Sequence, residues 1–131
     1  MRRTMLLALL LCCTIGSAAE AQPATPERGP SKCFFANQFE GWKAPDDKTL
    51  FIRVTPHRYF RLDLAGTCSS ITFPGSHLVT VFHGSDAVCT ALDWDLKVVQ
   101  SPHGIAEACI VKSMKELTPE EAAAIPPRFH P

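Results

Sequence analysis

The chain has 131 residues, of which 46% are hydrophobic and 20% charged, and its 13 basic side chains balance its 13 acidic ones. This length excludes more than one domain of ordinary size, and the apolar content excludes a wholly disordered protein. Because the charges balance, the chain lacks the basic excess that is typical of nucleic-acid-binding proteins. The composition points to no particular biochemical activity.

Residues 1–21 have the three parts of a secretory signal peptide. Arg2 and Arg3 supply positive charge, residues 5–15 form an uncharged apolar run, and a small-x-small site ends at Ala21. The apolar run is only about half as long as a helix that spans a bilayer. We therefore predict cleavage after Ala21 and a periplasmic or secreted protein without a membrane span.

Cleavage would leave a chain that begins at Gln22 and has a formal net charge of −1. Lipidation at Cys13 is the alternative, although no small residue precedes this cysteine as a lipidation site would require. Residues 22–31 are rich in proline and predict a flexible leader. We predict a single β-rich domain over residues 32–126, followed by a tail over residues 127–131.

Four cysteines remain after processing, and an even number in a short exported chain predicts two disulfides. Three pairings of Cys33, Cys68, Cys89 and Cys109 are open, and sequence alone does not choose among them. We favour Cys68–Cys89 nested inside Cys33–Cys109, because the outer bond would tie the N-terminal segment to the last predicted strand. Zinc sites use closely spaced cysteine pairs, whereas these spacings are 35, 21 and 20 residues.

The first elements in chain order are an aromatic cluster over residues 34–42 and a β-hairpin. The cluster suits either a helical turn or an extended segment. Residues 50–54 and 59–64 alternate between apolar and polar side chains on either side of a turn at residues 55–58, which predicts the hairpin. Alternation or apolar runs predict further strands at residues 77–83, 87–92, 93–99 and 108–114.

A short C-terminal helix is predicted from a capping pattern. Thr118 can cap the helix, Pro119 occupies its first position, and Glu121 can reach back to the cap. A helix of this length does not persist alone, so we expect it to dock through Leu117 and Ile125.

Together these elements predict a mainly β fold. We expect a small antiparallel barrel or curved sheet of about six strands, with one short C-terminal helix and two disulfides. Much of the core is predicted to come from the aromatic residues Phe34, Phe35, Phe39, Trp42, Phe51 and Phe60.

The histidines do not predict a metal site, because none of the five lies in an H-x-H or H-E-x-x-H pattern. His77 and His83 would stand about 20 Å apart along a continuous strand. The other three are His57, His103 and His130.

Two further groups could carry chemistry. Asp93 and Asp95 would share a strand face about 7 Å apart, as calcium ligands or an acid–base pair, but a solvated face is the simpler interpretation. Ser85 stands beside a histidine and an aspartate, although a triad needs residues from separate elements. We interpret this segment as a tight turn.

A third candidate is a surface on the predicted hairpin. Arg53, Arg58 and Arg61 flank Tyr59, and together they could bind an anion or an acidic partner. With a balanced net charge, ordinary pairing of these arginines with Asp63 or with glutamates is the favoured interpretation.

The order and spacing of several landmarks resemble a known family. They are Cys33, Asp46-Asp47-Lys48-Thr49-Leu50, Tyr59, Leu62-x-Leu64-x-Gly66-x-Cys68, Val88-Cys89, Asp93, Cys109-Ile110-Val111 and Leu117-Thr118-Pro119-Glu120-Glu121. The chain is similar over nearly its full mature length to the proteobacterial family catalogued as domain of unknown function 6491. The resemblance implies a small exported bacterial protein and no particular activity or catalytic residue.

We therefore expect a non-enzymatic periplasmic binding or envelope-accessory module without a cofactor. Its partner is unknown, and an envelope protein such as a hydrolase that it inhibits is one candidate. The alternatives are a carrier of a small ligand or metal, and a periplasmic hydrolase that uses Asp93 and Asp95.

Overall fold

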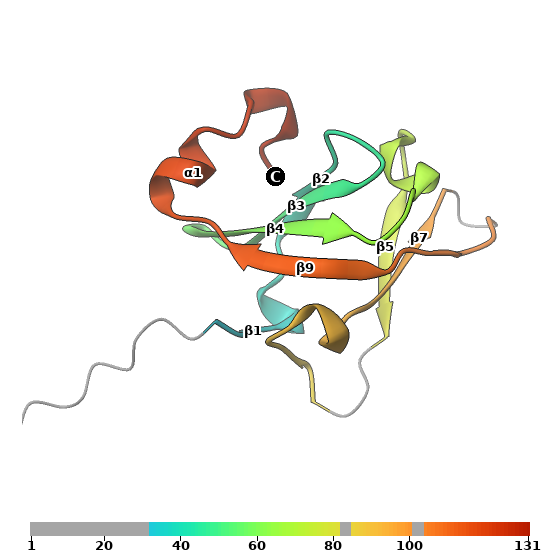
Figure 1. Cartoon of the computed structure of the whole chain (residues 1–131), viewed down its shortest axis with the longest axis horizontal. Coiled ribbons are helices and arrows are strands. Elements are labelled where there is room, and N and C mark those ends of the chain that lie inside the picture. Colours follow the sequence, from blue (N-terminus) through green and yellow to red (C-terminus); the bar gives the residue numbers. More distant parts are fainter. Residues whose placement is uncertain (1–31, 82–84, 101–103) are drawn as a thin grey trace, which may run out of the picture.

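The computed structural model describes residues 32–81, 85–100 and 104–131 (Figure 1). The predicted signal peptide and leader lie outside these residues, as do His83 and His103. None of the described helices is long and apolar enough to cross a membrane.

The described chain is mainly β, as predicted, and its strands pair antiparallel in three groups. The groups have the orders β2-β3-β4-β9, β5-β7-β8 and β1-β6. The strands are β1 (Phe34–Phe35), β2 (Gly41–Lys43), β3 (Thr49–Thr55), β4 (Arg58–Leu64), β5 (His77–Val81), β6 (Ala87–Val88), β7 (Asp95–Val99), β8 (Glu107–Ala108) and β9 (Val111–Glu116). The helical elements are η1 (Ala36–Gln38), η2 (Ser69–Thr72), η3 (Ala91–Asp93) and η4 (Pro127–Phe129), which are 3-10 turns, and the α-helix α1 (Pro119–Ala123).

The predicted hairpin is confirmed as β3 and β4. Leu50 lies opposite Leu62 and Ile52 lies opposite Phe60, so one face of the hairpin enters the core. The intervening residues, among them Arg61, face outward, as the alternation predicts.

The chain passes from one sheet to the other between β8 and β9. β8 pairs with β7, and β9 pairs with β4. At the break, the Cys109 amide donates to the Leu96 carbonyl at 2.9 Å, and the Ala65 amide donates to the Ile110 carbonyl at 2.9 Å. The two sheets are thereby joined into one strongly curved arrangement, which the described strands do not close into a barrel. The single strand predicted at residues 108–114 is thus two strands.

The core lies inside this curve. Phe34 and Phe60 are fully buried and their ring centroids lie 5.2 Å apart, while Trp94 packs edge-on against Phe34 at 5.6 Å. Phe39 and Trp42 pack against the core from its edge. The prediction was wrong for Phe35, which is half exposed, because its neighbour on β1 takes the inward position. It was also wrong for Phe51, which lies on the outward face of β3 between the buried Leu50 and Ile52.

Two predicted strands are shorter in the structure. The strand predicted at residues 87–92 ends after Val88, and the one predicted at residues 93–99 begins at Asp95. Between them the chain forms the 3-10 turn η3, which Thr90 and Asp93 cap.

The C-terminal helix has the predicted capping box. The Glu121 amide donates to Thr118 Oγ1 at 3.2 Å, and the Thr118 amide donates to Glu121 Oε2 at 3.0 Å. Ala122 and Ile125 are buried where the helix docks. The segment predicted as a tail includes η4, and the ring of His130 packs against Tyr59 on the outer face of the hairpin with 4.8 Å between centroids.

The favoured nested disulfide pairing is wrong. Cys33 is bonded to Cys89, and Cys68 is bonded to Cys109. The reason is strand register: Phe34 lies opposite Val88, which brings the residues flanking that pair together. Cys109 follows β8 at the point where the chain changes sheets, and this places it next to Cys68.

Candidate functional site

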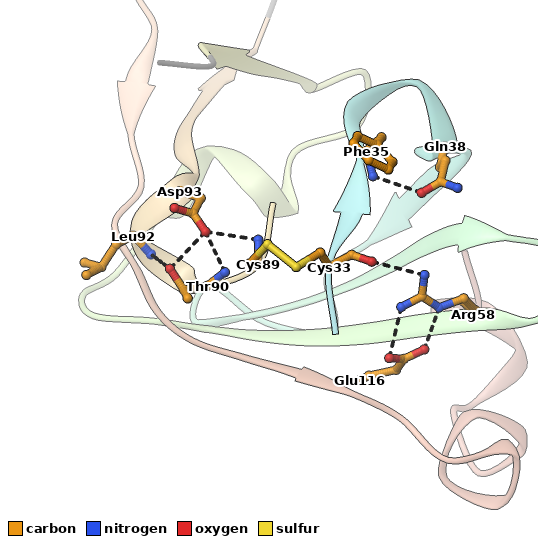
Figure 2. Close-up of a disulfide and its surroundings, with 9 residues drawn as sticks. All are labelled: Cys33, Phe35, Gln38, Arg58, Cys89, Thr90, Leu92, Asp93 and Glu116. Carbon is orange, nitrogen blue, oxygen red and sulfur yellow. Dashed lines mark hydrogen bonds and ion pairs between the residues drawn. A yellow bond between two sulfur atoms is a disulfide. The ribbon is translucent and has the colours of Figure 1, made fainter. Parts of the chain in front are cut away.

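Arg58, at the start of β4, belongs to the predicted arginine surface. It holds Glu116 of β9 through two parallel hydrogen bonds, Nε to Oε1 at 2.6 Å and Nη2 to Oε2 at 3.0 Å (Figure 2). Its Nη1 also donates to the Cys33 carbonyl at 3.3 Å. The hydrogen bond with Glu116 raises the pKa of Arg58. This guanidinium therefore ties β4 to β9 and to Cys33 of the Cys33–Cys89 disulfide.

The other two arginines also pair with carboxylates. Arg61 Nε lies 2.8 Å from Asp63 Oδ1, and Arg53 Nε lies 2.9 Å from Glu40 Oε2. Partial burial tends to raise the pKa of Asp63, but hydrogen bonds from Arg61 and Ser113 outweigh it and lower this pKa. The favoured interpretation, pairing with Asp63 and glutamates, is confirmed.

Tyr59 completes the predicted surface, and its ring packs against His130. The surface of Arg53, Arg58, Tyr59 and Arg61 is consequently a set of ion pairs and ring contacts. It offers an anionic ligand three cations whose charge is already balanced by carboxylates.

Asp93 and Asp95 do not form the predicted pair on one strand face. Asp93 ends η3, and its Oδ2 accepts hydrogen bonds from the Cys89 amide at 3.0 Å and the Thr90 amide at 2.7 Å (Figure 2). The bonds from Cys89 and then Thr90 lower the pKa of Asp93. Asp95 lies in β7, with Oδ2 3.5 Å from Lys97 Nζ. Asp93 therefore stabilises a turn.

The potential metal ligands that the described residues bring together are Cys68, Glu107 and Cys109, whose ligand atoms lie within 4.8 Å of one another. Both sulfurs are used in a disulfide, so neither is a thiolate that could bind a metal. The carboxylate of Glu107 accepts a hydrogen bond from the Ser70 amide at 2.9 Å, and hydrogen bonds from Ser70 lower its pKa. The group holds the loop after β4 against β8.

A surface that the sequence analysis did not single out is apolar. Leu92 on η3 is 94% exposed, and Ile110, between β8 and β9, is 71% exposed. Both line one shallow hollow of about 160 Å³, together with Ala91, Ala108 and Trp94. We call Leu92, Ile110 and this hollow the aliphatic surface.

The backbone on both sides of the aliphatic surface is fixed. The Leu92 amide donates to Thr90 Oγ1 at 3.3 Å, and the turn is attached to β1 through the Cys33–Cys89 disulfide (Figure 2). Ile110 directly follows Cys109 of the second disulfide. The structure therefore presents two exposed aliphatic side chains from anchored loops, and Figure 2 shows Leu92 pointing away from its capped turn.

A sequence signal for η3 did exist. Thr90 and Asp93 stand three residues apart, as Thr118 and Glu121 do at the C-terminal helix, and this is the spacing of a capping box. The alternation of residues 93–99 obscured this capping signal, because it makes Asp93 look like the first residue of a strand.

Comparison with known proteins identifies a family. The model of a family described as "Family of unknown function (DUF6491)" matches residues 1–126. No curated protein and no solved structure matches the chain. Since the match spans nearly the whole chain, including every strand among the described residues and the helix α1, the protein belongs to the DUF6491 family, whose function is unknown.

Proposed function

We propose that this protein is exported and acts as a non-enzymatic module that binds a protein of the cell envelope. The signal-peptide pattern of residues 1–21 supports export. The two disulfides support it too, because such bonds form and persist in oxidising compartments.

The aliphatic surface is the observation that carries the binding role. An exposed leucine or isoleucine alone is ordinary, but this pair lines one hollow and projects from two loops that disulfides anchor. Burial of one such side chain in an interface contributes about 1.5–3 kcal/mol. Because the loops are already ordered, little of this gain is lost to conformational entropy on binding.

The partner that fits this surface is a protein with apolar side chains at the centre of its contact. The candidate polar groups support a structural role instead of a catalytic one. Asp93 caps a turn and Arg58 joins two strands.

The test uses the full chain with both disulfides formed. The immobilised chain is exposed to solubilised envelope proteins of its source, and each retained protein is purified and its Kd measured. We expect the double variant Leu92→Ser/Ile110→Ser to raise Kd at least about 30-fold, as loss of a hot spot does. The matched control is Ile105→Ser, because Ile105 is 94% exposed and lies outside the aliphatic surface.

Unchanged Kd for Ile105→Ser with weakened binding by the double variant supports the proposal. Equal binding by the double variant and the original chain would overturn it, as would the failure of every retained protein to bind after purification.

Export has its own readout. We expect the mature protein from its native compartment to begin at Gln22, because cleavage is predicted after Ala21. N-terminal sequencing measures this directly, and a mature protein that still carries residues 1–21 would contradict export by this signal.

A further inference from the structure

β5 is an end strand, and among the described residues its one strand partner is β7. The directions of the backbone N–H and C=O groups of β5 follow from the way β7 pairs with β5 on one side and with β8 on the other. Leu96 uses its carbonyl on the β8 side, where Cys109 donates to it. Thr80 lies opposite Leu96, so this is a non-hydrogen-bonded pair and the N–H and C=O of Thr80 point away from β7. Leu78, two residues earlier, has the same orientation.

This free edge lacks the usual protection. End strands in native proteins are commonly guarded by lysine, proline or a bulge, which prevents pairing with other chains. The five residues of β5 include no charged residue and no proline, and their register with β7 is continuous. Val79 and Val81, on the face opposite Leu78, are 43% and 40% exposed.

An apolar hollow of about 240 Å³ lies on the other face of β5. Leu78 and Thr80 form one of its walls, so the residues with free backbone groups also line the hollow. Trp94 is held there by a hydrogen bond from its Nε1 to Thr80 Oγ1 at 2.7 Å. The rest of the lining is Phe34, Ala36 and Phe39.

A second hollow of about 380 Å³ lies between β2 and the segment that leads into β5. Trp42, Lys43 and Ala44 line it from the β2 side, and residues 71–76 line it from the β5 side. β2 and β5 are the two end strands of the curved arrangement that β8 and β9 join. We call the region of these two hollows the seam.

We propose that the seam accepts an extended segment of a partner protein, which adds as a strand to the free edge of β5. This is recognition by strand addition, in which backbone hydrogen bonds supply affinity and pockets for alternate side chains supply specificity. Partner residues opposite Leu78 and Thr80 place their side chains on the face of the first hollow, and the residue between them lies beside Val79.

The chemistry of the hollow defines the segment. Three of its lining residues are aromatic, so an aromatic ring in edge or offset contact fills it best. A second copy of this chain would offer its own β5, which contains no phenylalanine, tyrosine or tryptophan. The fitting occupant is therefore a partner segment with one aromatic side chain between β-branched residues. The seam does not include Leu92 or Ile110, so this inference stands independently of the proposed function.

The probe is the peptide acetyl-Lys-Thr-Val-Phe-Val-Thr-Lys-amide. As a strand it directs phenylalanine and both threonines to one face and the two valines to the other. Binding to the full, disulfide-bonded chain is measured by calorimetry, and the site is located by amide chemical shifts in NMR. We expect shifts at Leu78 and Thr80 and none at Leu92.

Two altered peptides separate the pocket from the backbone contacts. Replacement of phenylalanine by aspartate should abolish binding, because it places a charge in an apolar hollow. N-methylation of the phenylalanine amide should weaken binding about tenfold, since it removes a donor to the edge. Both experiments change only the peptide, so neither requires a variant of the chain to fold.

Variants of the chain supply the matched test. Leu78→Pro removes an edge donor without removing a hydrogen bond to β7, and it should abolish peptide binding. Leu92→Ser/Ile110→Ser alters exposed side chains outside the seam and should bind normally. Thermal melts confirm that the variants fold.

Four outcomes would overturn the proposal. They are absence of binding, equal affinity for the N-methylated peptide, shifts centred on Leu92, and a dimer of the chain that Leu78→Pro dissociates. The last would assign the seam to self-association, which sedimentation detects.

Discussion

The carboxylate of Asp93 orders the loop that carries Leu92. One oxygen of this exposed carboxylate accepts from two backbone amides and from the hydroxyl of Thr90. Charge-assisted hydrogen bonds of this kind are stronger than neutral ones. The aliphatic surface therefore depends on an acidic residue whose carboxylate caps the turn that carries Leu92.

Asp93→Asn tests this role through the pH dependence of stability. Hydrogen bonds lower the pKa of Asp93 in the folded chain, so its contribution is present above the unfolded pKa of about 3.9 and is lost as pH falls through the folded pKa. We expect Asp93→Asn to melt at a lower temperature than the original chain at pH 7, and the difference to shrink as the pH falls below about 4. Melts followed by circular dichroism from pH 7 to pH 3 measure it.

The control is Asp95→Asn, which removes a carboxylate from the neighbouring strand. Asp95 faces Lys97 at the surface, where such pairs contribute little. Equal losses in the two variants at pH 7 would contradict a special role for Asp93.

Arg58 gives a second prediction at this scale. Arg58→Lys keeps the charge but loses the two-bond contact with Glu116 and the bond to the Cys33 carbonyl. We expect a loss of about 1 kcal/mol in the free energy of unfolding, measured by urea denaturation. Arg61→Lys, at a more exposed pair, should change it by less than about 0.5 kcal/mol. A larger loss for Arg61→Lys than for Arg58→Lys would contradict this account of β4 and β9.

Among the elements, those whose determinants are local could be predicted. The β3–β4 hairpin follows from alternation, because one of its faces is buried and the other is not. The C-terminal helix follows from the capping residues Thr118 and Glu121. The break between β8 and β9 could not be predicted, since it depends on Ile110 pairing with Ala65 in one sheet while Cys109 pairs with Leu96 in the other.

Thr118→Ala should weaken the docking of α1. The substitution leaves the Glu121 amide without its acceptor, and loss of such a cap costs about 1 kcal/mol. Urea denaturation measures the change, and Thr118→Ser, which keeps a capping hydroxyl, should restore most of the stability. If the serine variant were no more stable than the alanine variant, the capping hydrogen bond would not be the cause.

At the scale of the whole molecule, the disulfides hold the two ends of the aliphatic surface. Their existence could be predicted from an even cysteine count, but their pairing could not, because it depends on the register of β1 with β6. The candidate site likewise has one feature that could be predicted from sequence and one that could not. Ion pairing of the arginines was predictable from balanced charge, whereas the exposure of Leu92 depends on a turn placed within an apparent strand.

The two disulfides should differ in their reaction with a reductant. Cys89 is exposed, whereas Cys68 and Cys109 are only 1% and 3% exposed. Since reduction requires access to sulfur, we expect Cys33–Cys89 to open first under native conditions. Stepwise reduction with alkylation and mass spectrometry measures the order, and earlier labelling of Cys68 and Cys109 would contradict the burial of that bond.

The most direct measurement is disulfide mapping of protein harvested from its native compartment and alkylated at once. Digestion with trypsin and Asp-N separates all four cysteines, because Asp86 lies between Cys68 and Cys89. An exported binding module with anchored loops predicts linked peptides for Cys33 with Cys89 and for Cys68 with Cys109. Four alkylated, unlinked cysteines, or a link between Cys68 and Cys89, would contradict it.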